Sequence, residues 1–339
     1  MKHIARSCPS VLKSASQINQ DLKFNNMQGP TFSIIVPIYG VEKYIRQCAD
    51  TVLGQTYPNI QFIFVNDGTK DNSMQVLDEL IEEKYAHLKD RIVIINKENG
   101  GLPAARKSGV EVATGDYILH VDSDDWIELD TAERIAEKAR ETDADLICFK
   151  VFKEEKKRTR VRGDRKYTDD QKEVFLRDIM THKAYGYTVN KCAKRKLYTE
   201  NKVYFARFGM FEDVFLMTQL VDYAGSYAHI DAPFYHYRRT NNESFTRQKR
   251  SVKRLYASMN MLDLYRAFRD DIQNSPIRQT TGRIFYHAAW CSIIYKLNLF
   301  ETYPEMRDMI MNTPVGGKNL LPLWQQIFVK FCVGINLIR

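Results

Sequence analysis

The chain has 339 residues, of which 44% are hydrophobic and 12% aromatic, enough to bury the core of one large domain or two smaller ones. Its formal net charge of +8 favours an anionic partner, which would be nucleic acid, a phosphorylated substrate or an anionic membrane surface. The six cysteines are scattered, which fits a reducing cytoplasm. The chain has no long apolar stretch, so we expect neither secretion nor a transmembrane helix.

Short apolar runs alternate with helical patterns from residue 31 onward, after an N-terminal extension over residues 1–30. The runs predict strands at 32–36, 60–65, 91–95 and 117–121. Helical patterns follow the first two strands, and the glycine-bearing segment ENGGLPAARKSGVEVATG lies between the last two. Strands separated by helices imply right-handed crossovers, so the sequence predicts an α/β domain with a mostly parallel central sheet and helices on both faces.

The rest of the chain is more varied. Asp130 and Glu133 have the spacing of a capping box, which predicts a helix over TAERIAEKAR. Residues 153–166 hold eight basic and three acidic residues, a pattern more typical of a solvated loop or hairpin than of a binding surface. Residues 247–254, RQKRSVKR, carry five basic residues and no acid. The final stretch 320–339 is too interrupted to span a bilayer and predicts a packed or an interfacial helix.

Three carboxylates, Asp122, Asp124 and Asp125, directly follow the fourth predicted strand in LHVDSDDW. Asp after a strand is also ordinary turn chemistry, and Asp125 fits that role. On extended backbone, residues i and i+2 point to the same side, so Asp122 and Asp124 can face one point. Two such carboxylates suit Mg²⁺ or Mn²⁺, which complete their coordination with water and nucleotide phosphates. Because ligands of open α/β sheets bind beyond the carboxyl ends of the strands, this pattern predicts a metal and nucleotide site.

Two further segments contain candidate site residues. The first strand is followed by PIYGVEKY instead of a GxGxxG fingerprint, and the chain has no GxxxxGK[ST] loop, so dinucleotide and P-loop chemistry lack their usual support. Tyr39 in this segment offers a face for a base and equally fits an ordinary half-buried aromatic residue. Glu212 and Asp213 precede an apolar helical run. They are candidates for helix-capping acids or for a catalytic base.

Four motifs in register resemble the family 2 glycosyltransferases of the GT-A fold. They lie in SIIVPIYGVEKYIRQCADTVLGQTYPNIQFIFVNDGTKDNS, NGGLPAARKSGVEVATGDYILHVDSDDW and GMFEDVFL. The resemblance covers residues 31–245 and is strongest over 31–127. That family uses nucleotide-sugar donors, frequently linked to UDP, and generally inverts the anomeric centre. The resemblance therefore implies an inverting hexosyltransferase-like enzyme of a bacterial polysaccharide type.

The resemblance also implies roles on the donor side. Pro37 and Tyr39 match the pocket for the donor base, and Asp67 matches the acid that hydrogen-bonds uracil. Asn66 replaces the first of the two acids usual before the glycine, and we expect base recognition to survive because Asp67 holds the matching second position. The remaining donor contacts implied by the match are Asn99, Arg106, Asp122, Ser123, Arg238 and Ser244. Taken alone, Arg106 would equally fit a surface helix.

The metal and the acceptor side complete the expected site. Asp124 would be the main ligand of Mn²⁺ or Mg²⁺, Asp122 would hold the ribose or assist the metal, and His236 is a further candidate ligand. Asp213 matches the catalytic base, and Glu212 would orient the acceptor.

The resemblance predicts three regions and a set of partners. Residues 31–245 would form the catalytic domain, divided into a nucleotide-sugar-binding half (31–127) and an acceptor-binding half (128–245), and 246–339 a helical basic and aromatic C-terminal region. We expect a UDP-sugar donor, a glycan or lipid-linked saccharide acceptor, and a cytoplasmic or peripheral place at the inner membrane face, where an anionic surface would attract the basic chain. No nucleic-acid motif is present, so no nucleic acid is expected.

Two alternatives remain open at this point. A sugar nucleotidyltransferase would usually carry a basic glycine-rich loop after the first strand, and this chain lacks one. A non-catalytic sugar-nucleotide-binding scaffold at membranes would not need the acids at Asp122, Asp124 and Asp213.

Overall fold

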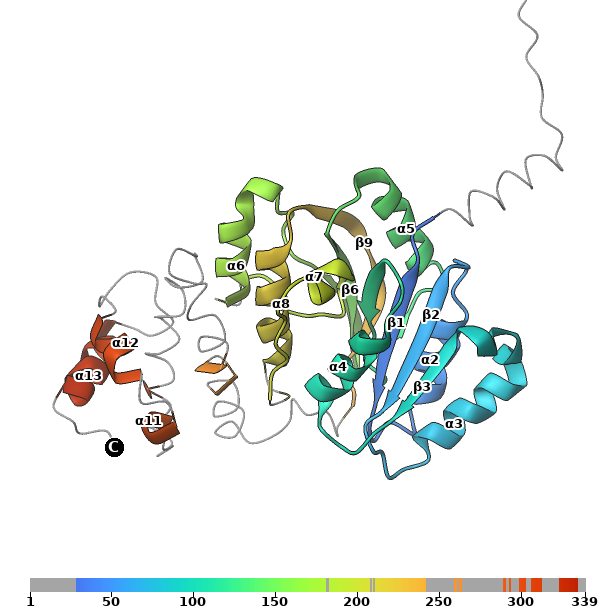
Figure 1. Ribbon diagram of the computed structural model, residues 1–339, viewed down its shortest axis with the longest axis horizontal. Helices are drawn as coiled ribbons and strands as arrows, with labels where there is room; N and C mark the ends of the chain where they lie inside the picture. Colours follow the sequence, from blue (N-terminus) through green and yellow to red (C-terminus); the bar gives the residue numbers. More distant parts are fainter. Residues whose placement is uncertain are drawn as a thin grey trace, which may run out of the picture.

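A computed structural model describes residues 29–180, 183–207, 209, 211–241 and helical stretches between 259 and 334 (Figure 1). The predicted N-terminal extension up to residue 28, the basic run 247–254 and Ser244 lie outside the described residues.

A nine-stranded sheet forms the centre of the described chain, in the order β3-β2-β1-β4-β8-β6-β9-β5, with β7 beside β6. Its first four strands pair in parallel, as the sequence predicts. They are β1 (Phe32–Ile38), β2 (Ile60–Asn66), β3 (Ile92–Asn96) and β4 (Tyr117–His120). Every residue of β1 is buried. A central parallel strand is covered on both faces, which explains why it reads as a nearly continuous apolar run.

The second half of the sheet is mixed. β8 lies between β4 and β6 and pairs antiparallel with both. β6 pairs parallel with β9. β5 pairs antiparallel with β9, and β7 pairs antiparallel with β6. Parallel pairing therefore holds among β1 to β4 and alternates with antiparallel pairing in the rest of the sheet. The bounds are β5 (Trp126–Ile127), β6 (Leu146–Glu155), β7 (Arg158–Arg162), β8 (Lys191–Lys194) and β9 (Tyr227–Arg238).

Helices cover both faces of the sheet, as predicted (Figure 1). One apolar core joins the sheet to α2 (Ile45–Leu53), α3 (Ser73–Leu80) and α5 (Thr131–Thr142). A second core on the opposite face joins it to α4 (Leu102–Val112), α6 (Lys172–Met180) and α8 (Glu212–Tyr223). The shorter helical segments are η1 (Ile81–Tyr85), η2 (Ala86–Arg91), η3 (Asp169–Gln171) and α7 (Lys196–Thr199).

Two local predictions have different outcomes. The basic run 153–166 includes a hairpin, because β7 pairs with the end of β6. The prediction of a capping box at the start of α5 was wrong. Asp130 is the N-cap residue but makes no side-chain capping bond, since its carboxylate accepts a hydrogen bond from Arg134 Nε at 2.7 Å. Glu133 instead accepts one from the Thr56 hydroxyl at 2.8 Å.

The described part of the C-terminal region is helical, as expected. Its helices are α11 (Leu299–Thr302), α12 (Met306–Asn312) and α13 (Leu323–Gly334). Val329 and Val333 of α13 are buried in a third apolar cluster, so this helix packs through one side. Over the described ranges, no helix has the length and apolar character needed to cross a membrane.

Candidate active site

Polar side chains gather where the parallel strands end. Asp67 directly follows β2 and is 2% exposed. Its Oδ1 accepts hydrogen bonds from Gly100 N–H at 2.9 Å and Lys97 Nζ at 2.6 Å, and its Oδ2 accepts one from Gly101 N–H at 2.7 Å. Gly101 is the N-cap residue of α4. The carboxylate therefore fixes the loop that carries Asn99 and leads into α4.

Gly68 brings the turn after β2 against the same loop. Its φ is +69°, and a Cβ at this position would lie 2.9 Å from the backbone nitrogen of Asn99. Only glycine fits such a conformation and such a close backbone approach. Asn99 and Tyr39 are exposed near these strand ends, and Tyr39 is 54% exposed.

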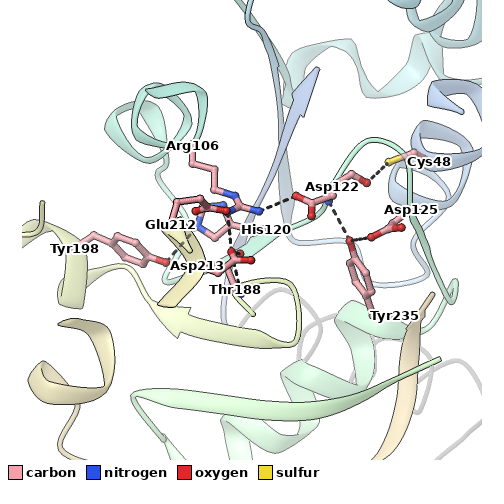
Figure 2. A network of polar contacts seen from close by, with 10 residues as sticks. All are labelled: Cys48, Arg106, His120, Asp122, Asp125, Thr188, Tyr198, Glu212, Asp213 and Tyr235. Atoms are coloured by element: carbon pink, nitrogen blue, oxygen red, sulfur yellow. Dashed lines mark hydrogen bonds and ion pairs between the residues drawn. The ribbon is translucent and has the colours of Figure 1, made fainter. Parts of the chain in front are cut away.

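Arg106 of α4 is the centre of a carboxylate network (Figure 2). Its side chain is 0% exposed. Nη2 donates to Asp122 Oδ1 at 2.7 Å, and Nη1 donates to Asp213 Oδ1 at 2.8 Å and to Glu212 Oε1. A guanidinium is the cation best suited to such a site, because its planar donors can bind several carboxylates at once. The strand-end acid and the helix-start acids thus meet on one cation.

The three carboxylates differ in their access to solvent. Glu212 is 5% exposed, whereas the side chains of Asp122 and Asp213 are 26% and 27% exposed. Burial raises the pKa of Glu212, and burial also raises the pKa of Asp122 to about 6 against the opposing charge of Arg106. Three carboxylates share one guanidinium, so their charges are not balanced within the network. Only Asp122 and Asp213 can reach a ligand.

The acids at the start of α8 occupy its first turn. The N-cap residue is Phe211, with φ +58°, so neither Glu212 nor Asp213 caps the helix. Asp213 Oδ1 also accepts a hydrogen bond from the Thr188 hydroxyl at 2.7 Å. Its Oδ2 accepts no hydrogen bond from any described residue and is free to receive a proton.

The segment 122–125 forms a turn, in which Asp125 N–H donates to the carbonyl oxygen of Asp122. Asp124 Oδ2 accepts a hydrogen bond from Asn241 at 2.8 Å, and the Asp124 carbonyl accepts one from Arg238 Nε at 2.7 Å. The Arg238 guanidinium carbon lies 4.5 Å from the centroid of the Trp126 ring. Arg238 of β9 is therefore held against the acidic turn. Ser123, between the two acids, is buried.

Asp125 has the turn-shaping role that the sequence allowed. It is 1% exposed and accepts hydrogen bonds from the Tyr235 hydroxyl and from Arg238 N–H, both at 2.7 Å. The same Tyr235 hydroxyl accepts a hydrogen bond from Asp122 N–H at 3.1 Å. Tyr235 thereby connects both ends of the acidic turn to β9 (Figure 2).

We expect Tyr235→Phe to lower the free energy of unfolding by about 1–3 kcal/mol, because it leaves a buried carboxyl and a buried N–H each short of a partner. Urea denaturation of the variant and of Tyr39→Phe would measure this. Tyr39 is exposed, so its hydroxyl should contribute little. Equal stabilities for the two variants would contradict the role assigned to Tyr235.

The side chain of His236 contacts residues outside the acidic turn. Its ring stacks between Trp126 and Phe152, with centroid distances of 4.7 and 4.5 Å. Both nitrogens are engaged, Nδ1 with Glu154 at 2.8 Å and Nε2 with Glu128 at 2.9 Å. A metal ligand needs a free nitrogen lone pair, so we leave His236 out of the proposed ligand set.

The carboxylates of the turn suit a hard divalent cation. No group of three or more His, Cys, Asp or Glu side chains that could hold a metal occurs in the described part of the chain. Mg²⁺ and Mn²⁺ sites for nucleotides need only one or two carboxylates, because phosphates and water supply the other ligands. Asp122 Oδ2 and Asp124 Oδ1 accept no hydrogen bond from any described residue, so both oxygens could take part.

Several contacts in this site were not predicted from the sequence. Thr188 holds Asp213, Asn241 holds Asp124, and Tyr235 holds Asp125. These hydroxyl and amide residues lie far from their partners in the chain and give no local sequence pattern. Arg106 was predicted to line the nucleotide phosphates, and the structure instead surrounds it with carboxylates. Its place in α4 was visible in the sequence, but its burial depended on acids 106 and 107 residues further on.

A family model described as glycosyl transferase family 2 matches residues 33–208, just over half of the chain. The chain belongs to glycosyl transferase family 2. This confirms the family that the sequence motifs resemble. The match contains Asp67, Arg106 and Asp124 and ends before α8, so the position of Asp213 rests on the geometry of the network.

Relatives among known proteins agree with this family. EpsH of Bacillus subtilis, which carries a provisional glycosyltransferase name, is 33% identical over 217 residues, or 62% of each chain. The minor teichoic acid biosynthesis protein GgaB of Bacillus subtilis is 27% identical over 318 residues, covering 91% of this chain and 32% of GgaB. The chain thus spans less than two thirds of either relative.

Among solved structures, S. aureus TarS 1–349 in complex with UDP-GlcNAc superposes with a TM-score of 0.58 at 18% identity, covering 90% of this chain and 92% of that one. The mannosyltransferase PcManGT of Pyrobaculum calidifontis, in complex with GDP-Man and Mn²⁺, gives 0.51 at 13% identity, covering 95% and 90%. At these identities the likeness establishes the fold alone. This family 2 member has the GT-A fold that its motifs implied.

Proposed function

We propose that this chain transfers a sugar from a UDP-sugar to a hydroxyl group of a glycan or lipid-linked saccharide, with inversion, in a metal-dependent single displacement. The observation that carries this proposal is the bonding of Asp122 and Asp213 to the two terminal nitrogens of one buried guanidinium. An acid suited to the donor and an acid suited to the acceptor are thereby fixed side by side. A scaffold that only bound nucleotide would not need the second acid.

The donor would lie over the strand ends. Tyr39 and Asp67 would meet the base, with Asn99 along the nucleotide, and the UDP-GlcNAc bound to TarS supports a UDP-linked donor. Asp124 and Asp122 would hold Mn²⁺ or Mg²⁺. When bound there, the cation would neutralise charge on the diphosphate. Arg238 would add a fork of donors for phosphate oxygens from the other side of the turn.

The chain's own residues would move the proton. Asp213 Oδ2 would accept the proton of the acceptor hydroxyl as its oxygen bonds to the anomeric carbon, while the bond from that carbon to the diphosphate oxygen breaks and UDP leaves. Thr188 and Arg106 hold the other oxygen of Asp213, which fixes the direction of the free one. Glu212 is buried and bonded to Arg106, so it would act through Arg106 as a positioning residue.

Calorimetric titration with UDP, with and without Mn²⁺, tests the donor site. We expect metal-dependent binding that is lost in Asp124→Asn and kept in Asp130→Asn, a surface carboxylate changed in the same way. GDP serves as the nucleotide control. If a folded sample binds no nucleotide, the donor assignment is wrong.

We also propose a peripheral position at the inner membrane face. The net charge of +8 and the RQKRSVKR run, which lies outside the described residues, support it. Protein that stays in the supernatant when anionic vesicles are pelleted at low salt would contradict it.

A further inference from the structure

Three tyrosines stack on one another beside Asp213, and we call Tyr185, Tyr187 and Tyr237 the tyrosine stack. The ring centroids of Tyr185 and Tyr187 lie 5.1 Å apart, and those of Tyr187 and Tyr237 lie 5.9 Å apart. All three side chains are partly exposed. Tyr187 immediately precedes Thr188, whose hydroxyl donates to Asp213. The stack therefore begins one residue from Thr188, the side chain that holds the group proposed to deprotonate the acceptor.

Basic side chains lie on the same face of the sheet as Tyr237. Lys153 of β6 is directly opposite Tyr237 of β9, and opposite residues of neighbouring strands share a face. Arg162 of β7 is opposite Val151, two residues before Lys153, so it shares that face as well. Arg239 follows β9, and its N–H donates to the carbonyl oxygen of Glu154 at 2.9 Å. We call Lys153, Arg162 and Arg239 the cation cluster.

The charges of this cluster act on one another. Burial lowers the pKa of Lys153, the positive charges of Arg239 and Arg162 lower it further, and the charge of Glu155 opposes them. The side chain of Arg239 also acts electrostatically on Tyr187 and Tyr237. The cluster and the tyrosine stack are thus neighbours, which agrees with the strand register.

No described carboxylate lies within 4 Å of the charged groups of the cation cluster. The acids nearby in the strands are bonded to other residues. Glu154 is bonded to His236 and Thr159, on the opposite face. Glu155 pairs with Arg158 at 3.0 Å and Arg160 at 3.4 Å. Like charges held close together repel one another, so an anion bound between them would be stabilised.

We propose that the tyrosine stack and the cation cluster form an acceptor subsite for a saccharide that carries a carboxylate or phosphate group close to the sugar with the reacting hydroxyl. Aromatic faces pack against the apolar faces of sugar rings, with hydroxyl groups at their edges for hydrogen bonds. The cations would take the anionic group. This inference rests on the proposed transfer function and names its acceptor class, and it gives part of the basic hairpin a binding role.

The test uses the full chain with UDP present at low salt and three probes. These are an oligosaccharide of alternating hexosamine and uronate, its methyl-esterified neutral form, and an oligomer of polyol phosphate. Calorimetry gives the dissociation constants. We expect one anionic probe to bind on the order of tenfold more tightly than the neutral one, since charge-assisted bonds contribute at about this level.

Paired variants locate the effect. Arg162→Gln with Arg239→Gln should weaken binding of the anionic probe on the order of tenfold, as two charged contacts are lost. The control pair, Lys156→Gln with Lys157→Gln, removes the same charge from the exposed turn of the same hairpin and should leave that binding nearly unchanged. Tyr187→Ala should weaken the binding of all saccharide probes that bind, and Tyr187→Phe should restore it.

Each outcome separates the acceptor subsite from the donor site. Preference for the uronate or for the phosphate probe identifies the anionic group. Equal weakening by both double variants would show a general charge effect and overturn the subsite. If the protein binds UDP but neither anionic probe, the subsite is wrong while the donor site stands. If the unmodified chain does not bind UDP, the proposed function is overturned instead.

Discussion

Replacing Asp213 by Asn is expected to lower turnover on the order of 10²–10⁴-fold, the usual contribution of a positioned general base. The amide has nearly the same shape and can still accept hydrogen bonds from Arg106 and Thr188 through its oxygen. It cannot take a proton from the acceptor hydroxyl. The affinity for UDP should therefore stay the same while the rate of sugar transfer falls.

Steady-state transfer from a UDP-sugar, measured beside UDP binding, would check this expectation. Asp222→Asn is a matched control because it makes the same change on α8, about 14 Å along the helix at 1.5 Å per residue. Its turnover should resemble that of the unmodified protein. Unchanged turnover in Asp213→Asn would mean that another group is the base.

Replacing Arg106 by Met is expected to lower the free energy of unfolding by about 3–5 kcal/mol, because removing one partner of a buried ionic network leaves charge without compensation. Here Asp122, Glu212 and Asp213 would all lose their shared cation. Urea denaturation would measure the loss. Arg134→Met is the control, since Arg134 pairs with Asp130 on the surface, where such a pair contributes only about 0–1 kcal/mol.

A second substitution separates lost charge compensation from lost packing. Adding Glu212→Gln to Arg106→Met removes one of the uncompensated carboxylates and should recover part of the stability. If the double variant is as unstable as Arg106→Met alone, the loss comes from the cavity left by the side chain. If Arg106→Met lowers the free energy of unfolding no more than Arg134→Met does, the proposed role of the network is wrong.

The first half of the fold was readable from the sequence because its strands are buried on both faces. β1 and β2 appear as mostly apolar runs, and α2 shows buried residues at helical spacing. The antiparallel β8 gave no such pattern. It reads KCAK, and its Lys191 is 2% exposed only because Asp164 and backbone carbonyls compensate its charge.

The site was predictable to a similar degree. The acids at Asp122, Asp124 and Asp213 could be singled out because they stand next to apolar elements, and their motifs matched a family. The partners that orient them could not be found in this way. Arg106 in α4 looks like any helical arginine, and only the tertiary fold brings Glu212 close enough to pair with it.

The Arg106 network also limits how this chain could be recombined with its relatives. A crossover after the acidic turn would separate Arg106 from Glu212 and Asp213, which lie in the other segment. A grafted second segment would therefore have to bring its own pair of acids at the start of the helix that replaces α8. Exchange of the 153–166 hairpin, which contributes to the proposed acceptor subsite, would be tolerated more readily than exchange of whole segments, because the hairpin can change while the shared cation keeps its partners.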